Sequence, residues 1–236
     1  MTVTTTSAAR RRGGELAGSS IGKKIAMAVS GVMLLGFVIV HFLGNLKVYQ
    51  GAEAFNHYAE GLREVGAPFF ARGQLLWAAR LVLLVAVSVH IGAAVQLVGQ
   101  SRRARPVAYA RFDTLSFSYA SRTMVWGGVL ILAFVIYHLM HLTLGLRAVH
   151  PDFVPGDAYH NFVAGFRVWP VALAYMAAMV PLGLHLYHGI WSAFQTLGAG
   201  DPGRSRMRRP AAAIIAGIVV VGNMSFPIAV LTGILR

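Results

Sequence analysis

The sequence predicts an all-α integral membrane protein, a bundle of five transmembrane helices. Of its 236 residues, 56% are hydrophobic and only 12% are charged, and a soluble domain carries roughly twice that charged fraction. The apolar residues form runs of about 20, the length of a helix that spans the hydrocarbon core of a bilayer. Only helices and closed barrels satisfy their backbone in lipid, and these runs lack the alternation of barrel strands.

The predicted helices follow a short polar segment. Residues Met1–Ser20 are rich in Thr, Ser, Gly and Arg, which is typical of a disordered tail, and residues 21–236 form one predicted transmembrane domain. The first apolar run is too long for the apolar region of a signal peptide, so we expect no cleavage. The five predicted helices are approximately Ile25–Leu46, Leu75–Val98, Met124–Leu146, Val171–Leu197 and Ala211–Leu235.

The basic residues predict the orientation and the membrane. About two thirds of the 21 Lys and Arg residues lie in the N-terminal tail, in the loop around Arg102–Arg111 and in the link Gly198–Pro210. By the positive-inside rule these segments are cytoplasmic, so the N-terminus lies in the cytoplasm and the C-terminus outside the cell (inner) membrane. Topology and anionic lipid account for the net charge of +13, so we expect no nucleic-acid partner.

The residue types limit the chemistry inside the membrane. The chain has no cysteine, which excludes thiolate zinc sites and iron–sulfur ligation within it. Any metal must be held by histidine, methionine or oxygen ligands. No Asp or Glu lies within the five runs, whereas a proton-coupled transporter would need paired carboxylates or broken helices there.

Several histidines lie within the apolar runs, where an ionisable residue marks a function by default. One intramembrane histidine is readily explained by a hydrogen bond to a neighbouring helix, but here four separate helices each offer at least one. His57, His150 and His160 fall in predicted outside loops, where we expect ordinary loop residues. The histidines within the runs are His41, His90, His138, His141, His185 and His188.

The depths of these histidines predict two pairs. At about 1.5 Å per residue, His41 lies about 24 Å and His138 about 21 Å beyond the inner ends of their helices. By the same measure His90 lies about 12 Å and His185 about 18 Å from the inner ends of theirs. His41 therefore pairs with His138 in the outer half, and His90 with His185 in the inner half. Two histidines at one level on different helices are what bis-imidazole haem ligation needs, which predicts two b haems.

His141 and His188 each follow one of these candidates by three residues. Since three residues are about one helical turn, height cannot say which histidine of each couple binds iron. The other member could bond a haem propionate or a neighbouring backbone group, or be an ordinary hydrogen-bonded bundle histidine. From the residues alone both assignments stay open.

The ordered motifs resemble one family, the membrane cytochrome b subunit of succinate dehydrogenases and fumarate reductases in its single-chain, five-helix, dihaem form. The resemblance covers about residues 22–198, and the fifth run, which lacks histidine, also fits. It is carried by the His41–Asn45 segment (HFLGN), the Gly51–Asn56 segment (GAEAFN) and the His185–Gly198 segment (HLYHGIWSAFQTLG). The spacing between His41 and His90 is also similar to that family.

The resemblance implies an electron path and selects the ligands. It matches His138 and His185, rather than His141 and His188, to the family's third and fourth axial ligands. A flavoprotein subunit would oxidise succinate, as in the tricarboxylic acid cycle, and an iron–sulfur subunit would pass electrons to haem and quinone in this chain. The quinone of such single-chain relatives is mostly menaquinone. Some members carry a glutamate where this chain has Gly183, which argues against proton transfer along that route.

Further candidates are polar residues near the membrane surfaces. Lys24, Ser30 and Arg122 are quinone candidates on the cytoplasmic side, although snorkelling or helix capping is the simpler explanation for each. Arg80 lies about 9 Å inside the outer end of its helix, within reach of an outer-haem propionate. The alternative function is the dihaem cytochrome b subunit of another quinone-linked dehydrogenase, such as a hydrogenase or formate dehydrogenase. The sequence does not decide the physiological direction, the haem potentials or whether the complex forms a higher oligomer.

Overall fold

The computed structural model describes residues 18–104, 119–197 and 205–236. Over these residues the chain forms helices and no strand, which confirms the predicted all-α class. Five helices are long and apolar enough to cross a membrane, as the five apolar runs predict. Most of the predicted disordered tail and most of the basic loop around Arg102–Arg111 lie outside the described residues, and Ser20, predicted to end the tail, begins a helix. The long helices are α2 (Ser20–Asn45), α4 (Gln74–Arg103), α5 (Tyr119–His138), α7 (Trp169–Thr196) and α8 (Ser205–Leu231).

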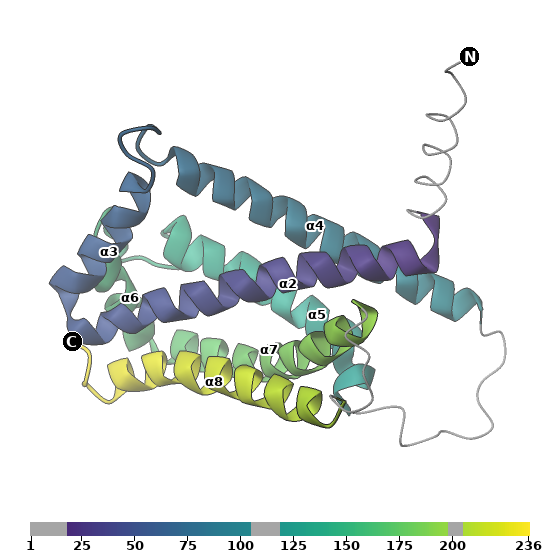
Figure 1. Cartoon of the computed structure of the whole chain (residues 1–236). Helices are drawn as coiled ribbons and strands as arrows, with labels where there is room; N and C mark the ends of the chain where they lie inside the picture. The colour runs from purple at the N-terminus through teal and green to yellow at the C-terminus, as the bar shows by residue number, and fades with distance from the viewer. Residues whose placement is uncertain (1–17, 105–118, 198–204) are drawn as a thin grey trace, which may run out of the picture.

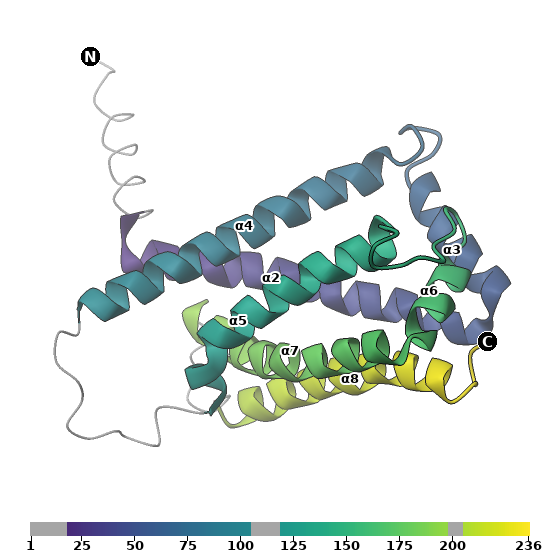
Figure 2. The same cartoon turned by 180° about the vertical axis from the view of Figure 1, so that it is seen from behind.

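The five long helices run alternately up and down along one bundle (Figures 1 and 2). Helix α7 packs against both α5 and α8, and α2 packs against α4 and α7. By contrast, α2 and α5 are not closely packed against each other among the described residues, and neither are α4 and α7. These two loosely approaching pairs of helices are the ones that carry the histidines paired by depth.

One end of the bundle is covered by two short helices, α3 (Ala52–Glu64) and α6 (Ala158–Arg167). We call it the cap end, and the opposite end, where α2 begins, the N-terminal end (Figure 1). Both short helices lie in segments predicted to be loops, so that prediction was wrong. Their buried phenylalanines Phe55 and Phe162 pack edge to face, with ring centroids 5.7 Å apart. Too short and too polar to span a bilayer, α3 and α6 lie across the ends of the long helices.

The connections at this end have fixed geometry. Gly51 precedes α3 with a φ of 97°, a conformation that glycine adopts without strain. Asn56 of α3 donates to the Asp157 carboxylate (2.9 Å) and accepts from the backbone N–H of Tyr159 (2.8 Å). The asparagine of the GAEAFN motif therefore fastens α3 to α6.

Helix α5 ends in a π-helical turn, Leu139–Thr143, in which the N–H of Leu144 donates to the carbonyl of Leu139 at 2.8 Å.

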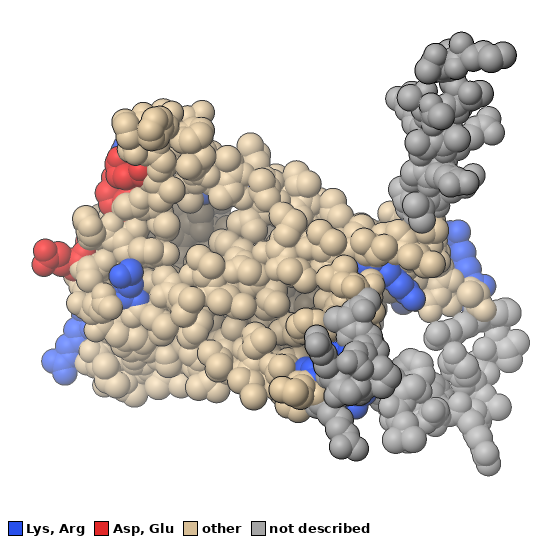
Figure 3. All heavy atoms as spheres, in the orientation of Figure 1, with Lys and Arg blue, Asp and Glu red and all other residues tan. Residues whose placement is uncertain are grey.

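The surface of the long helices is apolar, as lipid requires. Large side chains stand exposed along them, among them Trp77 and Trp169 near the helix ends, where tryptophan is enriched in membrane proteins. On the face drawn in Figure 3 the charged residues gather near the two ends of the molecule, and the band between them is almost uncharged. These features support a multi-pass membrane protein, while the direction in which it crosses the membrane remains a prediction.

Close helix packing depends on glycine at a few positions. Gly222 of α8 lies against the ring of Phe42 of α2, which is 7% exposed. A β-carbon at position 222 would overlap two carbons of that ring. Gly217, one turn and a half earlier on the same helix, has no atom within 4 Å of the corresponding position.

We predict that Gly222→Ala destabilises the bundle by about 1–3 kcal/mol, because Phe42 must move out of a packed site. Gly217→Ala is the matched control and should leave stability unchanged or raise it, since alanine favours helix. Thermal unfolding of both variants in detergent measures the effect. Equal melting temperatures for the two variants would show that Gly222 is not a packing constraint.

Candidate functional site

The candidate site consists of two pairs of histidines inside the bundle. His41 of α2 faces His138 of α5 with ring centroids 5.9 Å apart, and we call these the cap-end pair. His90 of α4 faces His185 of α7 with centroids 6.0 Å apart, and we call these the N-terminal pair. The structure thus brings together the partners that depth along the helices predicts, and their role as ligands remains a prediction.

The separation of the rings fits a metal between them. Imidazole nitrogens bind a metal at about 2 Å, so two rings on opposite sides of one metal have centroids roughly 6 Å apart. Each pair bridges two helices whose backbones are not closely packed among the described residues. A planar cofactor held between two helices needs that arrangement. The donor set and its spacing therefore fit a bis-histidine haem at each level.

In the N-terminal pair, hydrogen bonds occupy only one ring nitrogen of His90. His90 Nδ1 lies 3.1 Å from the carbonyl of Met27 and 3.4 Å from Ser30 Oγ. Because the carbonyl only accepts, Nδ1 carries the proton and Nε2 keeps its lone pair for a metal. Gly31 gives the ring its space, since a β-carbon there would lie 3.2 Å from His90 Cε1.

Two nitrogens near the N-terminal pair have no partner in the protein. Among the described residues, the Nδ1 atoms of His185 and His188 are the buried side-chain nitrogens or oxygens without a hydrogen bond. Leaving such a group unpaired costs about 1–3 kcal/mol. In native proteins an unsatisfied buried group calls for a bound ion, ligand or water. The orphaned nitrogens of α7 therefore point to a bound group at this level.

The cap-end pair lies among aromatic rings. Phe37 stacks on His41 at 5.3 Å, and Phe134 lies 6.0 Å from His138. His138 Nδ1 is 3.3 Å from the hydroxyl of Tyr175. The apolar rings exclude water from the pair, and Tyr175 supplies the polar contact of His138.

His150 differs from its prediction as an ordinary loop residue. It is 2% exposed and stacks on His141 with centroids 4.7 Å apart. Its Nε2 donates to the carbonyl of Asn161 of α6 at 2.8 Å. The burial of His150 could not be predicted from the sequence, because α6, which covers it, was itself predicted to be a loop. His57 and His160 are exposed on α3 and α6, as expected.

Three residues are predicted to bind a haem propionate: the two remaining intramembrane histidines, His141 and His188, and Arg80. His141, 1% exposed, has its Nδ1 2.9 Å from the Tyr175 hydroxyl. His188 packs edge to face against Trp191 at 5.7 Å. The guanidinium of the exposed Arg80 lies over the ring of Trp77, 4.8 Å from its centroid. The contacts of His141 and Arg80 are thus with aromatic side chains, and their propionate roles remain predictions.

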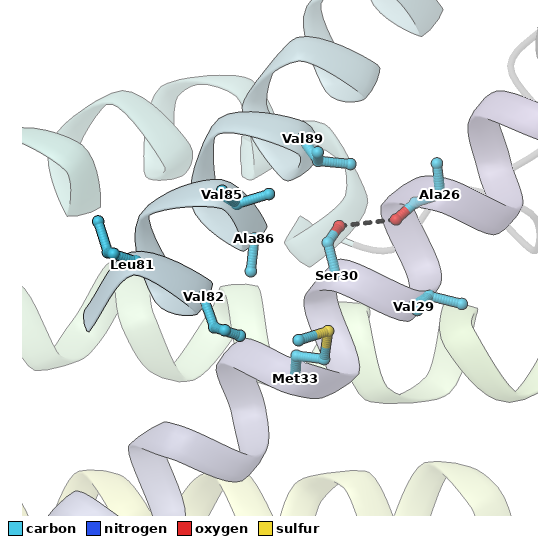
Figure 4. Close-up of a pocket in the computed structure, with 9 residues that line it drawn as sticks. All are labelled: Ala26, Val29, Ser30, Met33, Leu81, Val82, Val85, Ala86 and Val89. Carbon is cyan, nitrogen blue, oxygen red and sulfur yellow. Dashed lines mark hydrogen bonds between the residues drawn. The ribbon is translucent and has the colours of Figure 1, made fainter. Parts of the chain in front are cut away.

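The quinone candidates are spread along α2 and α5. Ser30 is 4% exposed and donates to the carbonyl of Ala26 at 2.7 Å. Ser30 is the polar member of an otherwise apolar groove of about 420 Å³ between α2 and α4 (Figure 4). Lys24 is exposed one and a half turns earlier. The side chain of Arg122 lies outside the described residues.

Gly183, which stands where some members of the similar cytochrome b family carry a glutamate, is a helix contact here. A β-carbon on Gly183 would lie 2.7 Å from Val220 Cγ2 of α8. A longer side chain would therefore push α7 and α8 apart, which explains glycine at this position in packing terms.

Comparison of the chain with protein-family models, with curated proteins and with solved structures gives no match.

Asp157 holds the start of α6, and with it the cover over His150. The backbone N–H of His160 and the Asn56 amide keep the pKa of the Asp157 carboxyl below its ordinary value of 3.8. A lowered pKa means that the carboxylate stabilises the fold at neutral pH, and that this contribution is lost as pH falls through the folded-state pKa.

We therefore predict that Asp157→Ala speeds hydrogen exchange in the first turn of α6 about fivefold at neutral pH, as expected for a lost N-cap of about 1 kcal/mol. The difference from wild type should shrink in acid. Asp152→Ala, which removes an exposed carboxylate nearby, is the control. A fivefold effect that persists at low pH would contradict the role of the ionised carboxylate.

Proposed function

We propose that the chain is the membrane-anchor and electron-transfer subunit of a succinate:quinone oxidoreductase, with two b haems. In this proposal His41 and His138 bind one haem iron, and His90 and His185 bind the other. The observation that supports it is the presence of two histidine pairs on four helices, at two levels, each about 6 Å between ring centroids. The specific enzyme rests on the resemblance of the HFLGN, GAEAFN and HLYHGIWSAFQTLG segments.

A bound b haem supplies one-electron iron redox chemistry that the side chains of this protein lack. The chain's own residues hold and orient the ligands. The N–H of His90 donates to the Met27 carbonyl, which fixes the tautomer that binds through Nε2. Apolar helices keep water away from both pairs, and a low dielectric around a redox group tunes its potential. Two levels of ligands give a route for electrons along the bundle.

The electrons must come from another subunit, because a chain without cysteine holds no iron–sulfur cluster. At the N-terminal end of the bundle, α4 ends in exposed basic residues, among them Arg102 and Arg103. Under the positive-inside rule this end faces the cytoplasm. Its positive charge suits an acidic surface of an iron–sulfur subunit as well as anionic lipid. The flavoprotein subunit that oxidises succinate would bind to that partner.

Quinone would enter from the membrane. The apolar groove between α2 and α4 suits an isoprenoid chain, and Ser30 provides a hydroxyl beside it. That hydroxyl now donates to Ala26, so it would have to turn to donate to a quinone carbonyl. Lys24, about 9 Å nearer the N-terminal end, adds a cation at the membrane surface.

We predict two haems b per chain in the wild type and one in each of His41→Ala and His90→Ala, because each variant loses one axial ligand. Pyridine haemochrome analysis against protein mass gives the count. His57→Ala, which removes an exposed histidine of α3, is the control and should keep both haems. A full haem content in His41→Ala and His90→Ala would contradict the assigned pairs.

We also predict that succinate chemically reduces the haems of membranes that contain the whole complex, as followed by their absorbance. Malonate, a competitive analogue, should block this reduction. This experiment separates the proposal from the alternative dehydrogenases. Reduction by hydrogen or formate, with none by succinate, would keep the haem sites and replace the partner enzyme.

A further inference from the structure

A buried chain of polar side chains runs away from the cap-end pair, among residues of α5, α6 and α7 and the segments that join them. Its centre is Tyr175 of α7, which is 7% exposed. The hydroxyl of Tyr175 lies 3.3 Å from His138 Nδ1 and 2.9 Å from His141 Nδ1. The rings of Phe134 and Phe166 meet the tyrosine ring edge to face at 5.0 and 4.9 Å. The phenol is therefore held between two histidines by packing on both sides.

The available donors and acceptors fix the direction in which hydrogen bonds are donated along this row of polar side chains. A neutral histidine that binds metal through Nε2 carries its proton on Nδ1. His138 then donates to the Tyr175 oxygen, and the single phenolic proton is left for His141 Nδ1. A phenol that donates its own proton becomes a better acceptor, because hydrogen bonds in a chain polarise one another.

His141 is fixed in turn by its surroundings. It is 1% exposed and lies in the π-helical turn Leu139–Thr143, and such turns recur at functional sites. His150 stacks on it and is anchored to the Asn161 carbonyl. Gly165 of α6 leaves the ring its space, since a β-carbon there would lie 2.9 Å from His141 Nε2.

Asn161 completes the arrangement. Its side chain accepts from the backbone N–H of Val154 and donates to the carbonyl of the same residue, both at 2.7 Å. His138, His141 and His150 thus each have one ring nitrogen with a defined polar neighbour, and both ends of the Asn161 amide are bound. A set of groups fixed in this way has little freedom to reorient when His138 binds a metal.

We propose that Tyr175 is the positioning residue of the cap-end haem ligand: its oxygen accepts a hydrogen bond from the Nδ1–H group of His138 and thereby sets the potential of that haem. The inference rests on the proposed haem function. An acceptor at Nδ1 makes a ligating imidazole more basic, which stabilises ferric over ferrous iron. The two levels differ here, because His90 donates to a backbone carbonyl and His138 to a phenol.

The test is a redox titration of the haem absorbance in the wild-type complex and in Tyr175→Phe. Phenylalanine keeps the ring and its packing and removes the hydroxyl. We expect both haems to be retained, the potential of the cap-end haem to rise, and that of the other haem to stay unchanged. The component missing from His41→Ala identifies the cap-end haem. Its low-temperature electron paramagnetic resonance signal should also change, because the ring of His138 is freer to rotate.

Tyr137→Phe is the matched control. Its ring stacks on His141 at 5.6 Å and meets Tyr175 at 6.0 Å, in the same aromatic cluster, and we expect no shift. His141→Leu is the second variant and covers the case in which Tyr175→Phe does not fold. It keeps the phenol but removes its acceptor, and should raise the same potential by a smaller amount.

The outcomes separate the two proposals. Two haems with unchanged cap-end potentials in Tyr175→Phe and His141→Leu would overturn the role of Tyr175 and leave the haem function intact. A shift of equal size in Tyr137→Phe would also overturn it, by showing that any change in the cluster has the same effect. A wild-type chain without haem would overturn the proposed function itself.

Discussion

A histidine placed inside a membrane must have its ring nitrogens bound, and most features of this structure follow from that constraint. The hydrocarbon core offers no water, so each unpaired nitrogen carries a desolvation penalty. The carbonyl of Met27 binds a nitrogen of His90, and the carbonyl of Asn161 binds one of His150. The Tyr175 hydroxyl binds a nitrogen of both His138 and His141. The Nδ1 atoms of His185 and His188 keep no protein partner among the described residues. The bundle therefore has buried polar groups that no described residue of the chain satisfies.

The helices are arranged around these groups rather than packed uniformly. Helix α7 packs tightly against α5 and α8, with Gly183 against Val220. The helices whose histidine rings face each other, α2 with α5 and α4 with α7, stay further apart among the described residues. At the cap end, α6 covers His141 and His150 and is fastened to α3 by Asn56 and Asp157. Close contacts thus fix the five long helices relative to one another, whereas α2 and α5, and likewise α4 and α7, approach each other through the side chains of a histidine pair.

The sequence was sufficient for the long helices and for the partners within each histidine pair. A run of about 20 apolar residues has one stable form in lipid, and the rise per residue then fixes depth. The short helices α3 and α6 could not be recognised in this way, because their hydrophobic faces pack on helix ends that are distant in sequence. The same reason hid the burial of His150 and the place of Tyr175 between His138 and His141. An interior tyrosine in an apolar run carries no signal of its own until the neighbouring helices are in place.

The most direct measurement of the central claim is the haem content of the purified wild-type complex, from a reduced-minus-oxidised spectrum and a pyridine haemochrome assay. The account predicts b-type absorbance and two haems for each copy of this chain, one for each pair of facing histidines. A complex that is folded and intact but contains no haem would contradict it, and would mean that the paired histidines only join helices to one another.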